Sequence, residues 1–117
     1  MTDRYLTITM QNDWKGALRA MCQSAKADTY QGEVLNFESP GDFFGKLSEK
    51  RWAIVRAIQG KGELSVRELA RAVGRDVKRV HEDVGILVGL GLLDRTEGGG
   101  VLCPYSSMHI DMYLKAA

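Results

Sequence analysis

The chain has 117 residues, 44% of them hydrophobic and 26% charged, with a formal net charge of +1. This composition predicts one globular domain with its own core, and no apolar run is long enough to span a membrane. The start of the chain shows no signal-peptide pattern, so we expect a cytoplasmic protein. The two cysteines, Cys22 and Cys103, are isolated, which excludes a CxxC-type zinc site and favours reduced thiols.

The charge is distributed unevenly along the chain. Residues 46–79 contain ten Lys or Arg and four Asp or Glu, a net charge of +6, whereas residues 1–45 and 80–117 carry −2 and −3. A basic segment of this kind is the electrostatic pattern that a DNA-binding surface needs.

Residues 1–45 show the pattern of a strand-helix-strand extension. Apolar and polar residues alternate over 5–10, which predicts a half-buried strand. A helix is predicted from Asn12 or Asp13 to about Lys26, and a second strand over 33–37. Two strands and one helix bury too little surface to be stable alone, so another segment must complete the sheet.

Two helices are predicted next, on either side of Ser48. Pro40 suits the first turn of a short helix over 42–47, which we expect to pack Phe43, Phe44 and Leu47 inward. Ser48 is placed to cap a longer helix that ends near Gln59, with an inner face of Trp52, Val55 and Ile58. Leu64, farther along, is predicted to add a minimal strand beside a later hairpin.

Residues 65–91 carry the clearest pattern in the chain. Ser65 and Glu68 form a predicted capping box for a helix whose apolar stripe is Val66, Leu69, Ala70 and Val73. Gly74 then tolerates the positive φ of a sharp turn. A second helix begins near Asp76 and ends at Gly91, with an inner stripe of Val77, Val80, Val84, Leu87 and Val88. Its internal glycines, Gly85 and Gly89, indicate either close packing of another backbone or a helix that kinks or ends early.

Two short amphipathic helices joined by a glycine turn indicate a helix-turn-helix, whose second helix lies in the DNA major groove. After Gly91 a hairpin is predicted from arms at 92–95 and 101–103 with a glycine-rich tip over 96–100, and a hairpin in this position is a wing. The predicted fold class is α+β, a winged helix-turn-helix over 46–105 that follows the extension. Its candidate DNA-contacting residues are Ser65, Arg67, Arg75, Lys78, Arg79, His81, Glu82, Arg95 and Thr96.

The C-terminal segment, 106–117, supplies the missing strand. Apolar and polar residues alternate from Met108 to Leu114. This strand pairs either with the N-terminal sheet of its own chain or with a partner subunit. Either way, one apolar set should be buried, namely Ile8, Met10, Ile110 and Met112. We expect a homodimer, because a lone winged helix covers too little DNA for tight specific binding.

The stretch 47–105 resembles MarR-like winged helix-turn-helix transcriptional regulators, and most closely a group of small archaeal and bacterial regulators often assigned as antitoxins. Their pattern L-x-x-K-R-W, S-x-R-E-L-A, G-R-D-x-x-x-V-H-x-D, L-x-x-L-G-L and P-Y is matched at Leu47, Lys50, Arg51, Trp52, Ser65, 67–70, 74–76, Val80, His81, Asp83, Leu87, 90–92, Pro104 and Tyr105. The resemblance covers about half of the chain. It implies sequence-specific DNA binding, regulation of transcription by repression, and a toxin protein as a partner.

The sequence gives little support for catalysis. His81 and His109 lie outside any nucleophile motif, and Glu82 and Asp83 are adjacent on a helix, so their side chains diverge. The glycines of 98–100 precede no helix and do not form a phosphate-binding loop. We therefore expect no enzymatic activity, no cofactor and no metal. The alternative to DNA binding is a winged helix that serves as a protein-interaction module.

Overall fold

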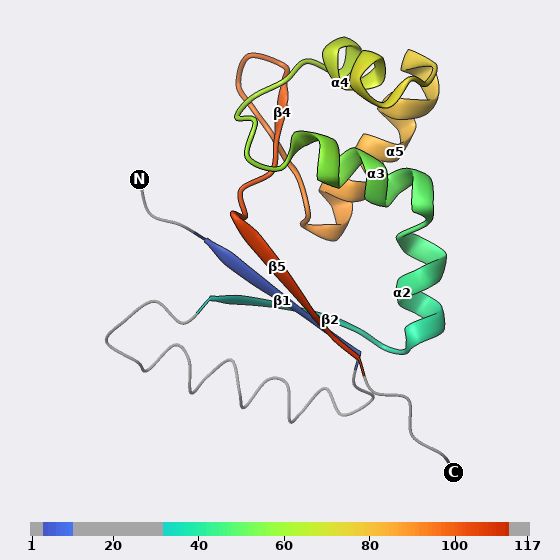
Figure 1. The fold of residues 1–117 in the computed structure, drawn as a ribbon, viewed down its shortest axis with the longest axis vertical. Coiled ribbons are helices and arrows are strands. Elements are labelled where there is room, and N and C mark those ends of the chain that lie inside the picture. The colour runs from blue at the N-terminus through green and yellow to red at the C-terminus, as the bar shows by residue number, and fades with distance from the viewer. Residues whose placement is uncertain (1–3, 11–31, 113–117) are drawn as a thin grey trace. The chain divides into compact units, whose positions relative to one another are not determined.

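The computed structural model describes residues 4–10 and 32–112, and the helix predicted over 12–26 lies outside them. The described residues form an α+β fold (Figure 1). The chain divides into two compact units. The first unit is Met1–Lys46 with Ser107–Ala117, and the second unit is Leu47–Ser106. Within the described ranges, no helix is both long and apolar enough to cross a membrane.

A parallel sheet organises the first unit. β1 (Tyr5–Met10) lies in the centre, with β2 (Glu33–Phe37) on one side and β5 (Ser107–Asp111) on the other (Figure 1). β1 is parallel to both neighbours. The C-terminal strand therefore pairs within its own chain, which decides between the two alternatives that the sequence left open.

The register of the sheet gathers its apolar residues on one face. Ile8 pairs with Leu35 on β2 and with Ile110 on β5, and paired residues of neighbouring strands point to the same side. Ile8 is fully buried, whereas Ile110 is 37% exposed and Met112 is 36% exposed. The prediction that Ile110 and Met112 are buried is thus wrong for a single chain, because β5 is an edge strand among the described residues.

α2 (Pro40–Lys46) follows β2 and extends its apolar face. The Ser39 hydroxyl accepts the N–H of Asp42 at 3.1 Å and so starts the helix. Phe43 is buried, with its ring edge-on to that of Phe37 and the two centroids 5.3 Å apart. Phe44 is 59% exposed, so its predicted inward packing is wrong. Adjacent residues of a helix point about 100° apart, and here only one of them faces the core.

Three helices and a hairpin enclose the core of the second unit (Figure 1). They are α3 (Glu49–Ile58), α4 (Val66–Val73), α5 (Val77–Leu90), β3 (Asp94–Arg95) and β4 (Val101–Leu102). All three helices and the hairpin contribute side chains that are at most 1% exposed, namely Ile54, Val55, Ile58, Leu69, Val80, Val84, Leu87 and Val101. Leu64 adds the predicted minimal strand, since it exchanges two backbone hydrogen bonds with Val101, of 2.9 and 2.8 Å.

Several predicted inner positions of the second unit are less buried than expected, and Val66, Val73 and Val88 are only half-buried. On α3, Ile54 is fully buried and Trp52 is only half-buried, so the inner face is rotated from the predicted stripe. On α5, Val77 is 43% exposed, although it lies at helical spacing with the buried Val80 and Val84. Val77 is the first residue of α5, where the helix extends beyond the core.

The helix ends agree with the predicted caps. The Ser65 hydroxyl accepts the N–H of Glu68 at 3.0 Å, while the Glu68 carboxylate accepts the N–H of Ser65 at 3.2 Å, which completes the capping box. Ser48 caps α3 with one bond, since its hydroxyl accepts the N–H of Arg51 at 3.4 Å. Gly74 (φ +69°) and Gly91 (φ +88°) end α4 and α5 in the left-handed conformation that glycine adopts at least cost.

α5 continues through Gly85 and Gly89 without interruption. No other backbone of the described residues lies within 4 Å of a methyl group placed on either glycine. The predicted close packing of another backbone is therefore not found among the described residues, and α5 does not end early at either glycine.

We expect Gly89→Ala to raise the free energy of unfolding by about 0.5–1 kcal/mol, because alanine loses less conformational entropy in a helix than glycine does. A methyl group there meets no described atom within 4 Å. Urea unfolding measures the effect. Gly91→Ala is the contrasting variant and should destabilise, because Gly91 has a positive φ. A Gly89→Ala protein that unfolds more readily than wild type would contradict this prediction.

Candidate nucleic-acid interface

The connection between α4 and α5 is a tight corner of three residues, 74–76. The N–H of Arg75 donates to the carbonyl of Ala70 at 3.0 Å. The Asp76 carboxylate accepts the N–H of Arg79 at 3.4 Å and is the N-cap of α5. These bonds fix the direction in which α5 begins, and its first three residues are exposed.

Asp83 on α5 binds this corner to α3. Its carboxylate accepts from Nε of Arg51 on α3 at 3.1 Å and from Nη2 of Arg75 at 2.9 Å. We call these three residues the Asp83 cluster; their side chains are 15–23% exposed. Burial acts to raise the pKa of Asp83, but the hydrogen bonds and charges of both arginines outweigh it and hold that pKa below its usual value. The ionised carboxylate of Asp83 therefore joins α5 to α3 and to the corner between α4 and α5.

The sequence predicted that Arg75 lies on the exposed outer face of α5, and this prediction is wrong. Its Nη2 is bound to Asp83, and its Nη1 is buried without a hydrogen-bond partner among the described residues. Arg75 precedes the N-cap, and helical spacing does not apply outside the helix. Its guanidinium positions the corner instead of presenting a free charge.

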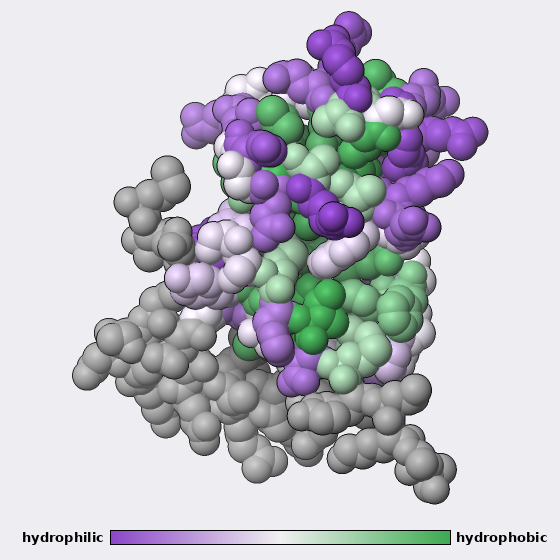
Figure 2. Space-filling view, in the orientation of Figure 1, coloured by the Kyte–Doolittle hydropathy of each residue, from purple (hydrophilic) through white to green (hydrophobic). Residues whose placement is uncertain are grey.

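The other candidate residues on the two helices remain at the surface. Lys78, Arg79, His81 and Glu82 on α5 are exposed, as is Arg67 on α4. Ser65 is half-buried and its hydroxyl is engaged in the capping box. Figure 2 shows hydrophilic residues gathered over α4 and the first turns of α5. The structure thus brings most of the candidate residues to the two sides of one corner.

The position of Gly85 shows which face of α5 is turned toward the hairpin. A methyl group on Gly85 would lie 3.8 Å from Nη2 of Arg95 on β3. Lys78, His81 and Glu82 precede Gly85 by seven, four and three residues, which places them on the same face of the helix. We call these four residues the hairpin-side face of α5.

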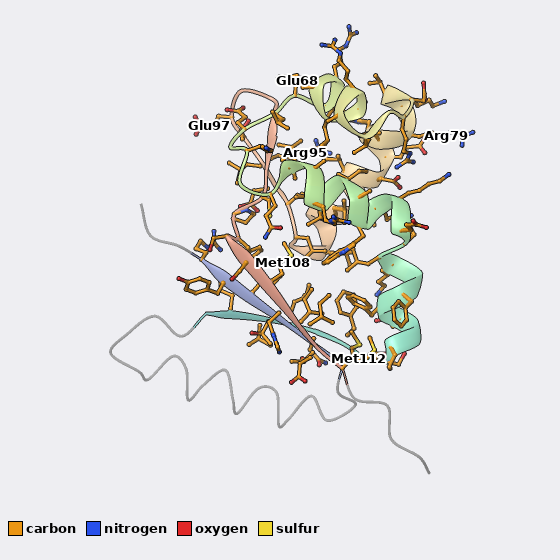
Figure 3. The ribbon with its side chains drawn as sticks, in the orientation of Figure 1. Glu68, Arg79, Arg95, Glu97, Met108 and Met112 are labelled. Carbon is orange, nitrogen blue, oxygen red and sulfur yellow. The ribbon has the colours of Figure 1, made fainter. Side chains whose placement is uncertain are left out.

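Arg79 lies on a different face. It precedes Gly85 by six residues, which turns it about 120° away from the hairpin-side face. Figure 3 shows Arg79 and Glu97, at the hairpin tip, on opposite sides of the second unit. Arg79 and the hairpin-side face therefore point to different parts of any ligand that lies across the corner.

The hydroxyl of Thr96 stabilises the hairpin. It donates to the Glu63 carboxylate and accepts the N–H of Gly100 at 2.9 Å. A methyl group on Gly100 would lie 2.7 Å from Cγ of Glu63. Only glycine at this position leaves enough room for the Glu63 side chain. Thr96 was a candidate for contact with DNA, but its hydroxyl is engaged within the second unit.

The charge on the hairpin is mainly negative. Asp94 and Glu97 are exposed beside a single cation, Arg95, and Glu63 adds a third carboxylate at the base. Phosphates repel carboxylates, so this hairpin is a poorer partner for a DNA backbone than the start of α5.

The Asp83 cluster and the contact of Glu63 with Thr96 were not predicted from the sequence. Asp83 precedes the buried Val84 and follows the exposed Glu82, and this position at the edge of a buried stripe was a usable signal. Its partner Arg51 is 32 residues away, and no local spacing indicates that pair.

Comparison with known families gives a match over the second unit and the start of β5. The model of the HVO_A0114 family matches residues 46–110, a range that includes α3, α4, α5, the hairpin and most of β5. No curated protein and no solved structure matches the chain. Because the matched range is more than half of the 117 residues, the chain belongs to the HVO_A0114 family.

Proposed function

We propose that this protein binds double-stranded DNA through a winged helix-turn-helix and regulates transcription. In this proposal α4 and α5 form the helix-turn-helix, α5 is the recognition helix and the β3–β4 hairpin is the wing. The observation that carries the proposal is the exposed, basic start of α5, which the Asp83 cluster holds against α3. A rigid element that presents Lys78 and Arg79 suits contact with phosphates and base edges.

The two faces of α5 support separate roles. The hairpin-side face would lie in the major groove, where Lys78 donates to O6 or N7 of guanine. Arg79, on the other face, would bind a phosphate at the groove edge, as would Arg67 at the start of α4. Among the candidates on the hairpin, Arg95 supplies the only positive charge.

We further propose that the protein acts as a homodimeric repressor. Two copies reach half-sites about one helical turn apart, and a dimer binds such a site far more tightly than one copy does. Ile110 lies on β5, an edge strand among the described residues, and Met112 follows the end of that strand; their exposed apolar side chains support self-association. The resemblance to regulators assigned as antitoxins adds a cognate toxin as a protein partner.

A second candidate function is protein interaction through the hairpin. It is favoured by the carboxylates of Glu63, Asp94 and Glu97, which suit a basic protein surface better than a phosphate backbone. The two candidates use different elements, so variants of the hairpin and of α5 separate them.

A fluorescence-anisotropy titration with a labelled random-sequence duplex tests the proposal. If about five phosphates are contacted, the affinity should fall roughly five-hundredfold between about 50 and 200 mM salt, because each contact releases counterions. A protein that binds no duplex even at about 50 mM salt would contradict DNA binding.

Variants of α5 sharpen the same experiment, with a duplex enriched from a random pool as the specific ligand. Lys78→Ala should weaken binding to the enriched duplex by about 1–3 kcal/mol, and binding to random duplex much less, because Lys78 contacts a base. Arg79→Ala should weaken both by the same factor and reduce the salt slope by about 1. The opposite pattern would show that the roles of the two faces are exchanged.

A further inference from the structure

Val77 has an apolar side chain that does not pack fully into the core. It is the first residue of α5 and is 43% exposed, whereas Val80, three residues later, is fully buried. Its neighbours are polar: the capping Asp76 precedes it, Lys78 follows it, and His81 lies one turn farther along the same side. His81 belongs to the hairpin-side face, so Val77 lies at the edge of the surface proposed to contact DNA.

The major groove offers such a side chain one kind of apolar partner. Thymine carries a C5-methyl group there, and cytosine, adenine and guanine present only donors, acceptors and ring edges. Residues in the first turn of a recognition helix come closest to the base edges. The branched methyl groups of valine fit a methyl contact, and the adjacent cation of Lys78 draws the same segment toward phosphates and guanine.

We propose that Val77 packs against the C5-methyl group of a thymine and makes that thymine a specificity determinant of the DNA site. The inference rests on the proposed function and deepens it, because it names a base and the residue that recognises it.

The same helix provides a matched control. Ile86 is 39% exposed, similar to Val77. It lies nine residues later, so the two side chains point to opposite sides of the helix. It is seven residues after Arg79 and so shares the face that points away from the hairpin. Ile86 therefore shows how replacing an exposed apolar residue of α5 affects DNA binding when that residue does not face the groove.

The test begins with duplexes enriched from a random pool by the full-length wild-type protein. Each thymine of the enriched sequence is then replaced in turn by uracil, which lacks only the methyl group. For wild type, at least one replacement should weaken binding about fourfold, the expected effect of one unburied methyl group. For Val77→Ala the same replacement should change the affinity by less than about 1.5-fold, while Val77→Ile and Ile86→Ala should retain the fourfold effect. Thermal melting by circular dichroism verifies that each variant is folded.

The outcomes distinguish this inference from the proposed function. An enriched sequence at which no uracil replacement matters, or a Val77→Ala protein that keeps the full uracil effect, overturns the role of Val77 and leaves DNA binding intact. Selection that enriches no sequence overturns sequence-specific binding itself, and the role of Val77 with it.

Discussion

Replacing Asp83 by asparagine should lower the free energy of unfolding by about 2–3 kcal/mol, somewhat less than the loss of a fully buried ion pair. The change removes the carboxylate charge that two arginines share, and it leaves the partly buried guanidinium of Arg75 without the counterion that Nη2 has in the wild type. For a unit of this size, the midpoint of thermal unfolding should fall by roughly 10–20 °C.

Glu82→Gln is the matched control for Asp83→Asn. Glu82 is the adjacent carboxylate on the same helix, but it is exposed and lies outside the Asp83 cluster. Its replacement should change the free energy of unfolding by less than about 0.5 kcal/mol. Equal effects of the two variants in urea unfolding would show that the cluster does not stabilise the second unit.

The effect of Asp83 should also depend on pH. The folded-state pKa of Asp83 lies below its usual value, so its contribution is fully present above the usual aspartate pKa of about 3.9 and is lost as the pH falls through the folded-state pKa. The difference in stability between wild type and Asp83→Asn should therefore be constant near neutral pH and shrink in strong acid. A difference that grows on acidification would contradict the assignment.

Replacing Ile110 by aspartate should dissociate the proposed homodimer. An unpaired charge in an apolar interface costs several kcal/mol, which weakens association at least a hundredfold. The isolated chain should tolerate the change, because Ile110 is 37% exposed within it. Sedimentation velocity at tens of micromolar should find a dimeric wild type and a monomeric, folded variant.

The control for Ile110→Asp lies on the same strand. His109 is exposed and, one residue earlier, points to the opposite face of the sheet. His109→Asp should therefore remain dimeric. A monomeric wild type at this concentration, where a dimer with a Kd of about 1 μM would be largely assembled, would contradict the dimer.

Features that depend on a few neighbouring residues were predictable from the sequence. The caps at Ser48 and Ser65 and the turn at Gly74 each depend on contacts within about four residues, and the structure confirms them. The α+β class, the three strands of the first unit and the hairpin tip followed from alternation and glycine placement in the same way.

Features that depend on tertiary context were not predictable. Val77 has perfect helical spacing with the core, yet burial depends on how far the core extends, which periodicity does not report. Arg75 has the chemistry of a DNA contact, but its position is decided by Asp83 on the next helix. For Ile110, alternation predicted the correct face of the strand, and only the sheet order shows that β5 is an edge strand among residues 4–10 and 32–112.

The pairing of β1 with β5 has a consequence for the order of folding. Tyr5 pairs with Ser107, so the whole second unit is inserted between two adjacent strands of one sheet. Bringing such distant strands together costs loop-closure entropy, whereas the second unit is built from contacts closer in the chain. Folding of the second unit first would fix Leu47 and Ser106 relative to each other. Within that unit the side chain of Gln59, the C-cap of α3, donates to the Ser106 carbonyl at 3.2 Å. We therefore expect the sheet to assemble late, which leaves its apolar strands open to intermolecular pairing during synthesis.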